Sequence, residues 1–126
     1  RAADLMRFVG LADYVGAVAD SMPYGALKRL EIARALAAEP RLLLLDEPAA
    51  GLNPAETAEI DDLIQKISET GVTVVLVEHD MKLVMGVSDH ILVIERGHLL
   101  AEGTGAEIRH NPDVVAAYLG EEGRGL

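Results

Sequence analysis

The sequence has no cysteine and no tryptophan, and its aromatic residues are one phenylalanine and three tyrosines. Without cysteine the chain can form neither a disulfide framework nor a thiolate site, and a reducing compartment is permitted. Half of the residues are nevertheless apolar. This composition favours an aliphatic α/β core over a β-sandwich or a protein that stacks on nucleic-acid bases.

Basic residues are also scarce, since 11 lysines and arginines face 21 aspartates and glutamates and the formal net charge is −10. Binding along a phosphate backbone depends on basic side chains that displace counterions, so we expect no nucleic-acid partner. A nucleotide is not excluded, because a few local donors are enough to bind one.

Long hydrophobic runs and an initiating methionine are absent as well. The longest apolar candidate, residues 72–77, ends at Glu78 and is far shorter than the roughly 18 residues of a membrane helix. The 126 residues suit one domain or part of one. The chain opens with Arg1 inside a helical pattern that does not resemble a signal peptide, and we expect it to have been cut from a longer protein.

Helical and extended patterns alternate along the chain. The second predicted helix buries Ala26, Leu30, Ala33 and Ala37, and turns Lys28, Arg29 and Arg34 outward, where we expect Arg29 and Arg34 to form ion pairs. The predicted helices are residues 3–18, 26–38, 54–70, 81–85 and 105–119 (the last broken near Pro112); the predicted strands are residues 42–45, 72–77 and 91–94, with a hairpin return at 99–101 and a mobile tail at 121–126.

The helix after residue 53 has the clearest signals. Asn53 is its expected N-cap, Pro54 stands at the first helical position, and Glu56 falls where a capping box requires an acid. Ile60, Leu63, Ile64 and Ile67 then recur at helical spacing, and Gly71 closes the segment.

Strands that alternate with helices predict a parallel sheet with any site at the carboxyl ends of its strands. The leucine run 42–45 predicts a strand covered on both faces and ends in Asp46-Glu47, and the strand 72–77 ends in Glu78-His79-Asp80. Asp46 can hold Mg²⁺, because hard cations take oxygen ligands, and Glu47 can act as general base on a water. With His79 as a hydrogen-bonding partner, these residues suit phosphoryl transfer.

Three segments occur in the order of motifs from ABC-transporter ATP-binding subunits: "MPYGALKRLEIARAL", "LLLLDEPAAGLNP" and "VVLVEHD". They resemble the signature, the Walker B strand with its D-loop, and the H-loop. The segment from Glu78 to Gly120 resembles the branch that energises branched-chain amino acid importers, and lipopolysaccharide-export and urea-uptake ATPases are near relatives. The resemblance implies the C-terminal half of a P-loop NTPase (RecA-like) domain, with parallel strands, flanking helices, a β-hairpin and a helical tail.

The resemblance also implies roles for individual residues. Asp46 corresponds to the Walker B aspartate that supports Mg²⁺, Glu47 to the general base and His79 to the switch histidine. The signature, which binds ATP held by the opposite subunit of a head-to-tail dimer, corresponds to Met22, Pro23, Tyr24, Gly25 and Ala26. The D-loop, which crosses to that subunit, corresponds to Ala50, Gly51, Leu52 and Asn53.

The implied cofactors are ATP and Mg²⁺. The implied partners are a second ATPase subunit and integral membrane permease subunits, which would place the protein in the cytoplasm, peripherally on the inner face of the membrane. By the same resemblance, residues 1–38 are the remainder of a helical subdomain, residues 39–103 belong to the catalytic core and residues 104–126 form the tail.

The sequence departs from the superfamily pattern at the signature and lacks one motif altogether. Pro23 replaces a common serine, Ala26 and Leu27 replace common polar residues, and Asn53 replaces the usual D-loop aspartate. No G-x-x-x-x-G-K-[ST] phosphate loop occurs in the chain. We therefore expect the second half of an ATP site without the loop that binds most of the nucleotide, and an inactive isolated chain.

Two other functions are compatible with these residues. The chain could act as a short, non-catalytic interaction module that docks on an intact ATPase subunit, or as an α/β domain unrelated to transport. A chain without its first half should also expose apolar sheet and helix surface, and we expect it to self-associate.

Overall fold

The computed structural model describes residues 1–119. These residues belong to two compact units, Arg1–Val77 and Glu78–Leu126. The fold is α/β, with parallel strands, helices and an antiparallel hairpin, as the sequence predicts.

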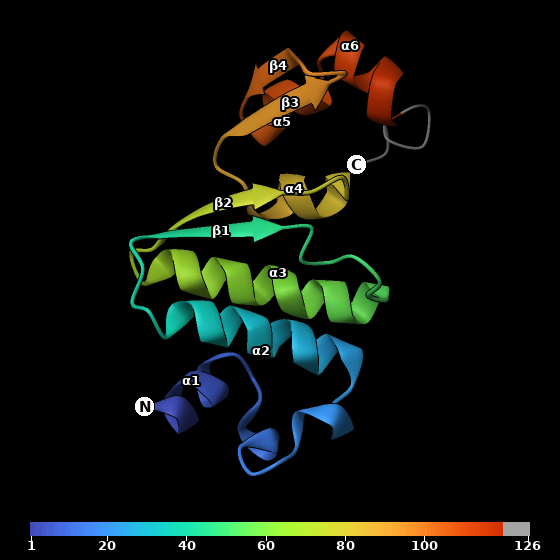
Figure 1. Cartoon of the computed structure of the whole chain (residues 1–126). Coiled ribbons are helices and arrows are strands. Elements are labelled where there is room, and N and C mark those ends of the chain that lie inside the picture. The colour runs from blue at the N-terminus through green and yellow to red at the C-terminus, as the bar shows by residue number, and fades with distance from the viewer. Residues whose placement is uncertain (120–126) are drawn as a thin grey trace. The chain divides into compact units, whose positions relative to one another are not determined.

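The first unit combines a pair of parallel strands with helices (Figure 1). Strands β1 and β2 pair in register from Leu42 opposite Thr73 to Asp46 opposite Val77. Helix α3 packs against β2, and α2 contacts α1. The elements are β1 (Leu42–Asp46), β2 (Thr73–Val77), α1 (Ala2–Phe8), α2 (Tyr24–Leu36), α3 (Pro54–Glu69) and the 3₁₀ turns η1 (Ala12–Tyr14) and η2 (Ala19–Ser21).

Strand β1 is covered on one face and open on the other. Leu43 and Leu45 are buried, whereas Leu42 and Leu44 are 52% and 69% exposed. The prediction of a strand covered on both faces is therefore wrong for this chain, because an unbroken apolar run does not show which faces find a partner. Val75 and Val77, paired with Leu44 and Asp46, extend the exposed apolar face. The expected uncovered sheet surface is confirmed, and self-association stays a prediction.

Helix α3 follows its sequence signals closely. The side chain of Asn53 accepts a hydrogen bond from the Glu56 amide at 2.8 Å, and Glu56 accepts one from the Asn53 amide at 3.1 Å, which completes the predicted capping box. The buried face consists of the four predicted residues, Ile60, Leu63, Ile64 and Ile67. Helix α3 thus provides a fixed support for the residues that precede it.

The predicted helix 3–18 is interrupted, because the chain leaves the helical conformation at Gly10 with φ +82°. Arg29 of α2 donates to the carbonyl oxygens of Val9 and Gly10 at 3.4 and 3.5 Å, so its guanidinium occupies this corner. Arg29 also pairs with Glu59 of α3 at 3.1 Å. The expected ion pairing of Arg29 is confirmed, but its predicted outward orientation is wrong, since its side chain is only 22% exposed.

Helix α2 starts and ends about two residues earlier than predicted. Ala26 and Ala33 are buried as predicted, together with Ile32, whereas Leu30 is half-buried and Ala37 is exposed. The shift brings Tyr24 and Gly25 inside the helix. Tyr24, Gly25 and Ala26 of the predicted signature thereby lie in its first turn.

The second unit packs a hairpin and short helices around a small core. That core consists of Val84, Ile91, Val93, Ile108 and Val114, with Met81 and Met85 packed against it. The hairpin turns at Arg96 and Gly97, which both have positive φ. The elements are α4 (Met81–Val87), β3 (Ile91–Glu95), β4 (His98–Gly103), α5 (Gly105–Arg109), α6 (Pro112–Val114) and the π-helical turn η3 (Val115–Leu119).

The predicted break of the last helical segment near Pro112 is confirmed. The predicted mobile tail, residues 121–126, lies outside the described residues. Within residues 1–119, no helix has both the length and the apolar character needed to cross a membrane.

Candidate functional site

The backbone changes direction immediately after β1. Asp46 is the last residue of the strand, and the amide of Glu47 still donates to the Val77 carbonyl oxygen at 2.7 Å, which extends the pairing of β1 with β2 by one residue. Glu47 has φ +48°, a left-handed conformation that is uncommon for a residue with a side chain. Such conformations concentrate at functional sites, where the surrounding structure holds them in place. Both carboxylates are exposed at this edge of the sheet.

The predicted D-loop is a tight connection between Glu47 and α3. The amide of Ala50 donates to the carbonyl oxygen of Glu47, and that of Leu52 to the carbonyl oxygen of Ala49, both at 3.1 Å. Gly51 lies inside the second of these turns and has φ +78°. The loop ends at Asn53, which is held in the capping box of α3. Its two ends are therefore anchored, one to the sheet and one to the helix.

The predicted signature residues form the amino-terminal end of α2. Met22 and Ala26 are buried, and Pro23 is the N-cap, with ψ 156° before the helix begins. The amide of Leu27 donates to the Pro23 carbonyl oxygen at 3.0 Å. The amides of the preceding first turn have no acceptor within the helix, and together with the helix dipole they favour an anion.

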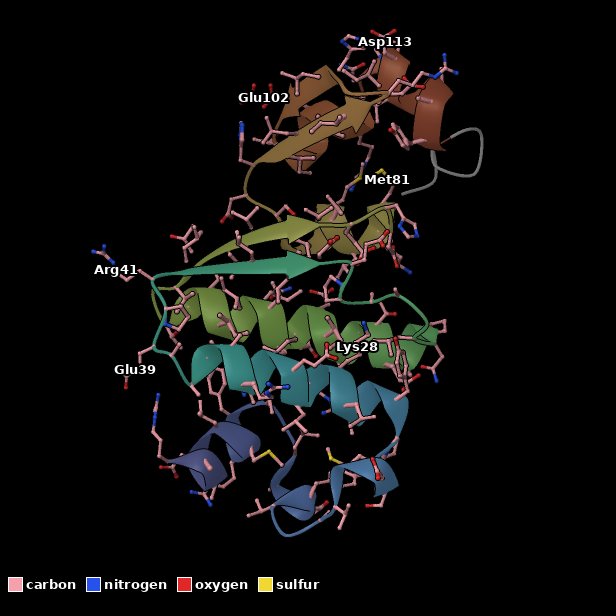
Figure 2. All side chains as sticks on the ribbon, in the orientation of Figure 1. Lys28, Glu39, Arg41, Met81, Glu102 and Asp113 are labelled. Carbon is pink, nitrogen blue, oxygen red and sulfur yellow. The ribbon has the colours of Figure 1, made fainter. Side chains whose placement is uncertain are left out.

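The first unit brings the predicted signature and the predicted D-loop into contact. A β-carbon on Gly51 would lie 3.0 Å from the ring of Tyr24. A β-carbon on Gly25 would overlap Oε2 of Glu56, the capping-box residue of α3. Lys28, labelled on α2 in Figure 2, places its Nζ 5.5 Å from the centre of the Tyr24 ring. The sequence identified both motifs but gave no sign of these contacts.

A pocket of about 200 Å³ lies between α2 and the end of β1. Small-molecule sites usually have roughly 300–1,000 Å³, so this pocket does not enclose a nucleotide by itself. It places a cation and a carboxylate near each other at the end of β1. Its lining residues are Lys28, Glu31, Ile32, Ala35, Leu44, Leu45, Asp46 and Pro48.

His79 stands near the start of the second unit. Its amide donates to Oε1 of Glu78 at 3.1 Å, and its Nδ1 lies 3.8 Å from the same oxygen. The next residue, Asp80, caps α4 by accepting from the Leu83 amide. His79 and the pair Asp46-Glu47 belong to different units, so their predicted convergence stays a prediction.

The residues at the end of β1 suit part of a MgATP site. Asp46 and Glu47 offer carboxylate oxygens, the ligand type that Mg²⁺ prefers, and the first turn of α2 offers amides of the kind that bind phosphate. The chain contains no phosphate loop. The described residues therefore offer groups that suit a metal ion and a phosphate, without the loop that would hold most of a nucleotide.

Two family models match the chain. The model described as ABC transporter matches residues 1–50, and the model described as branched-chain amino acid ATP-binding cassette transporter matches residues 98–124.

Characterised relatives match nearly the whole chain. It is 55% identical to BraF of Pseudomonas aeruginosa over 95% of its length, and 52% identical to LivG of Salmonella typhimurium over 96%; both are described as high-affinity branched-chain amino acid transport ATP-binding proteins. It is 36% identical to the lipopolysaccharide export ATP-binding protein LptB of Escherichia coli, over 98% of its length and 52% of LptB. The chain spans about half the length of the curated relatives it matches, 48% for both BraF and LivG.

Solved structures agree with this relationship. An ATP-binding cassette of an ABC transporter in its ADP conformation is similar with a TM-score of 0.85 and 30% identity, over 95% of this chain and 49% of that one. A nucleotide-free cassette is similar with a TM-score of 0.83 and 31% identity, over 95% and 49%. The chain belongs to the ABC-transporter ATP-binding family and corresponds to about half of such a subunit.

Proposed function

We propose that this chain supplies the Walker B, D-loop and signature parts of an ATPase that drives an ABC importer. The observation that carries the proposal is the geometry after β1. Glu47 stands at the sheet edge in a left-handed conformation, and a short anchored loop joins it to α3. Residues held in such sparsely populated conformations cluster at active sites.

Each residue then has a distinct task. Asp46 holds Mg²⁺, directly or through water, and Glu47 accepts the proton of the attacking water as general base. His79 hydrogen-bonds the phosphate or that water. When bound, Mg²⁺ neutralises the charge that develops on the phosphates. Residues 22–26 bind ATP held by a partner subunit, and residues 50–53 reach toward that subunit.

The transported substrate in this proposal is a branched-chain amino acid. The support is the similarity to BraF and LivG, which exceeds the similarity to LptB by 16 or more percentage points of identity (52 − 36 for LivG). The partners are a second ATPase subunit and membrane permease subunits, through which the protein attaches peripherally to the inner face of the membrane. A similar structure from Clostridium perfringens is part of an ABC transporter complex, which supports such partners.

Uptake by cells tests this proposal. Cells that lack their own branched-chain ATP-binding subunits would receive the complete subunit that contains this chain, with its permease, and the uptake of labelled leucine would be measured. We expect uptake with the wild type and none with Glu47→Gln, while Glu69→Gln, which changes an exposed acid at the end of α3, retains it. Uptake by the Glu47→Gln cells at the wild-type rate would contradict the assigned base.

A non-catalytic role is the second candidate. The exposed apolar face at Leu42, Leu44, Val75 and Val77 favours association with another protein, such as an intact ATPase subunit. In that case the chain would change the activity of the intact subunit in mixtures, and Glu47→Gln in this chain would leave that effect unaltered.

A further inference from the structure

We propose that Glu56 is a positioning residue that fixes the D-loop to the signature helix. The expected effect of Glu56 on ATP turnover rests on the function proposed above. The contact itself lies entirely within the first unit. The two segments are far apart in the sequence. Glu56 contacts both of them.

One oxygen of Glu56 serves the D-loop. Its Oε1 accepts the Asn53 amide at 3.1 Å, while its own amide donates to Oδ1 of Asn53 at 2.8 Å. These two bonds determine where the D-loop ends and α3 begins. The conformation of Asn53 therefore depends on where the Glu56 carboxylate lies.

The other oxygen packs against the signature. A β-carbon on residue 25 would overlap Oε2 of Glu56 and lie 3.2 and 3.6 Å from its Cδ and Cγ, and these are the three nearest atoms to that position. Gly25 lies in the first turn of α2 with an ordinary helical backbone, so a β-carbon there would not strain φ but would displace the Glu56 carboxylate. A carboxylate beside the amino-terminal end of α2 is also favoured by the helix dipole.

The second contact between the segments lies beside the first. The ring of Tyr24 approaches Gly51 so closely that a β-carbon there would lie 3.0 Å from it. Tyr24 thus contacts Gly51, and the neighbouring residue Gly25 contacts Glu56. Any displacement of the first turn of α2 is transmitted to both the middle and the end of the D-loop.

The geometry predicts that Gly25→Ala changes stability in opposite directions in the presence and in the absence of the Glu56 side chain. In a helix, alanine is more stabilising than glycine. We expect Gly25→Ala to lower the urea midpoint of this chain when Glu56 is present and to raise it in the Glu56→Ala background, where the overlapping atoms are gone. Gly16→Ala is the control, because a β-carbon at this turn position would meet no atom within 4 Å beyond its chain neighbours, and it should shift the midpoint equally in both backgrounds.

Amide hydrogen exchange locates the effect. In Gly25→Ala, the Asn53 amide should exchange as fast as in Glu56→Ala, because the displaced carboxylate no longer accepts it. Glu56→Gln, which keeps the acceptor and the volume, should protect Asn53 like the wild type. Equal effects of Gly25→Ala in both backgrounds, or an Asn53 amide unaffected by Gly25→Ala, would overturn the proposal.

The consequence for turnover is tested in the complete subunit. We expect Glu56→Ala to lower kcat on the order of 10²-fold, which is the effect of a misplacement of about 1 Å, and to change KM for ATP little. Glu56→Gln should have a kcat like that of the wild type. Glu107→Ala is the matched control, since it removes the equivalent capping-box acid from α5 in the second unit and should leave kcat unchanged. Equal loss of kcat in Glu56→Ala and Glu107→Ala would mean that Glu56 acts only as a helix cap.

These tests separate the two proposals. The exchange and stability measurements involve no nucleotide, so a failure there refutes the role of Glu56 alone. A complete wild-type subunit that does not hydrolyse ATP would refute the proposed function and leave the contact intact.

Discussion

The backbone conformation at Glu47 has a measurable effect on stability. We compare Glu47→Gly with Glu47→Ala, because both remove the same side chain and keep the amide that donates to Val77. At φ +48° the folded state of an L-residue with a side chain is destabilised by about 1–2 kcal/mol relative to glycine. Glycine loses roughly 0.5–1 kcal/mol more conformational free energy on folding. The glycine variant should therefore be the more stable, by up to about 1.5 kcal/mol.

An exposed position inside α3 is the control. Asp62 lies in the interior of that helix, where alanine is favoured over glycine by about 1 kcal/mol. The glycine variant should consequently be the more stable of the two at residue 47, and the alanine variant the more stable at residue 62. The assay is equilibrium urea unfolding followed by circular dichroism, with all four variants at one protein concentration because association would alter the midpoint.

The outcome bears directly on how the site is held. A glycine variant more stable than the alanine variant at residue 47 would show that the fold imposes the left-handed conformation on Glu47. The same order at residues 47 and 62, with alanine more stable at both, would refute the reasoning.

Two further predictions concern the core and the second unit. Ile67 is fully buried, so Ile67→Ala should lower the free energy of unfolding by about 2–5 kcal/mol and Ile67→Val by about 0.5–1.5 kcal/mol, measured by urea unfolding; equal losses would contradict this packing. The Thr104 amide, then its hydroxyl, and the charge of His90 lower the pKa of Glu107 from its ordinary value of 4.5. Because this folded-state pKa is lowered, the stabilisation is present above the unfolded pKa and is lost as pH falls through the folded one. Thr104→Val should raise the pKa of Glu107 in an NMR titration and Thr104→Ser should not; an unchanged pKa in Thr104→Val would exclude the hydroxyl as a cause.

Local signals in the sequence predicted local structure well. Asn53, Pro54 and Glu56 predicted the start of α3, and the spacing of its isoleucines predicted the buried face, because both depend on residues within one or two helical turns. The hairpin at Gly97 and the break at Pro112 were predictable for the same reason. The order of the motifs identified the family.

Long-range contacts could not be predicted in this way. The glycine at residue 10 is a local signal for the end of α1, but the position of the Arg29 side chain, which donates to the carbonyl oxygens of Val9 and Gly10 from another helix, is not. The leucine run of β1 predicted a strand but could not show that one face stays open. The contact of Gly25 with Glu56 joins residues with no shared pattern, and only the fold brings them together.

The most direct test of the central claim is ATP binding and hydrolysis by the complete subunit with Glu47→Gln. If Glu47 is the general base, the variant should bind ATP with unchanged affinity and hydrolyse it on the order of 10²–10⁴-fold more slowly than the wild type. Hydrolysis at the wild-type rate with ATP bound would contradict the account.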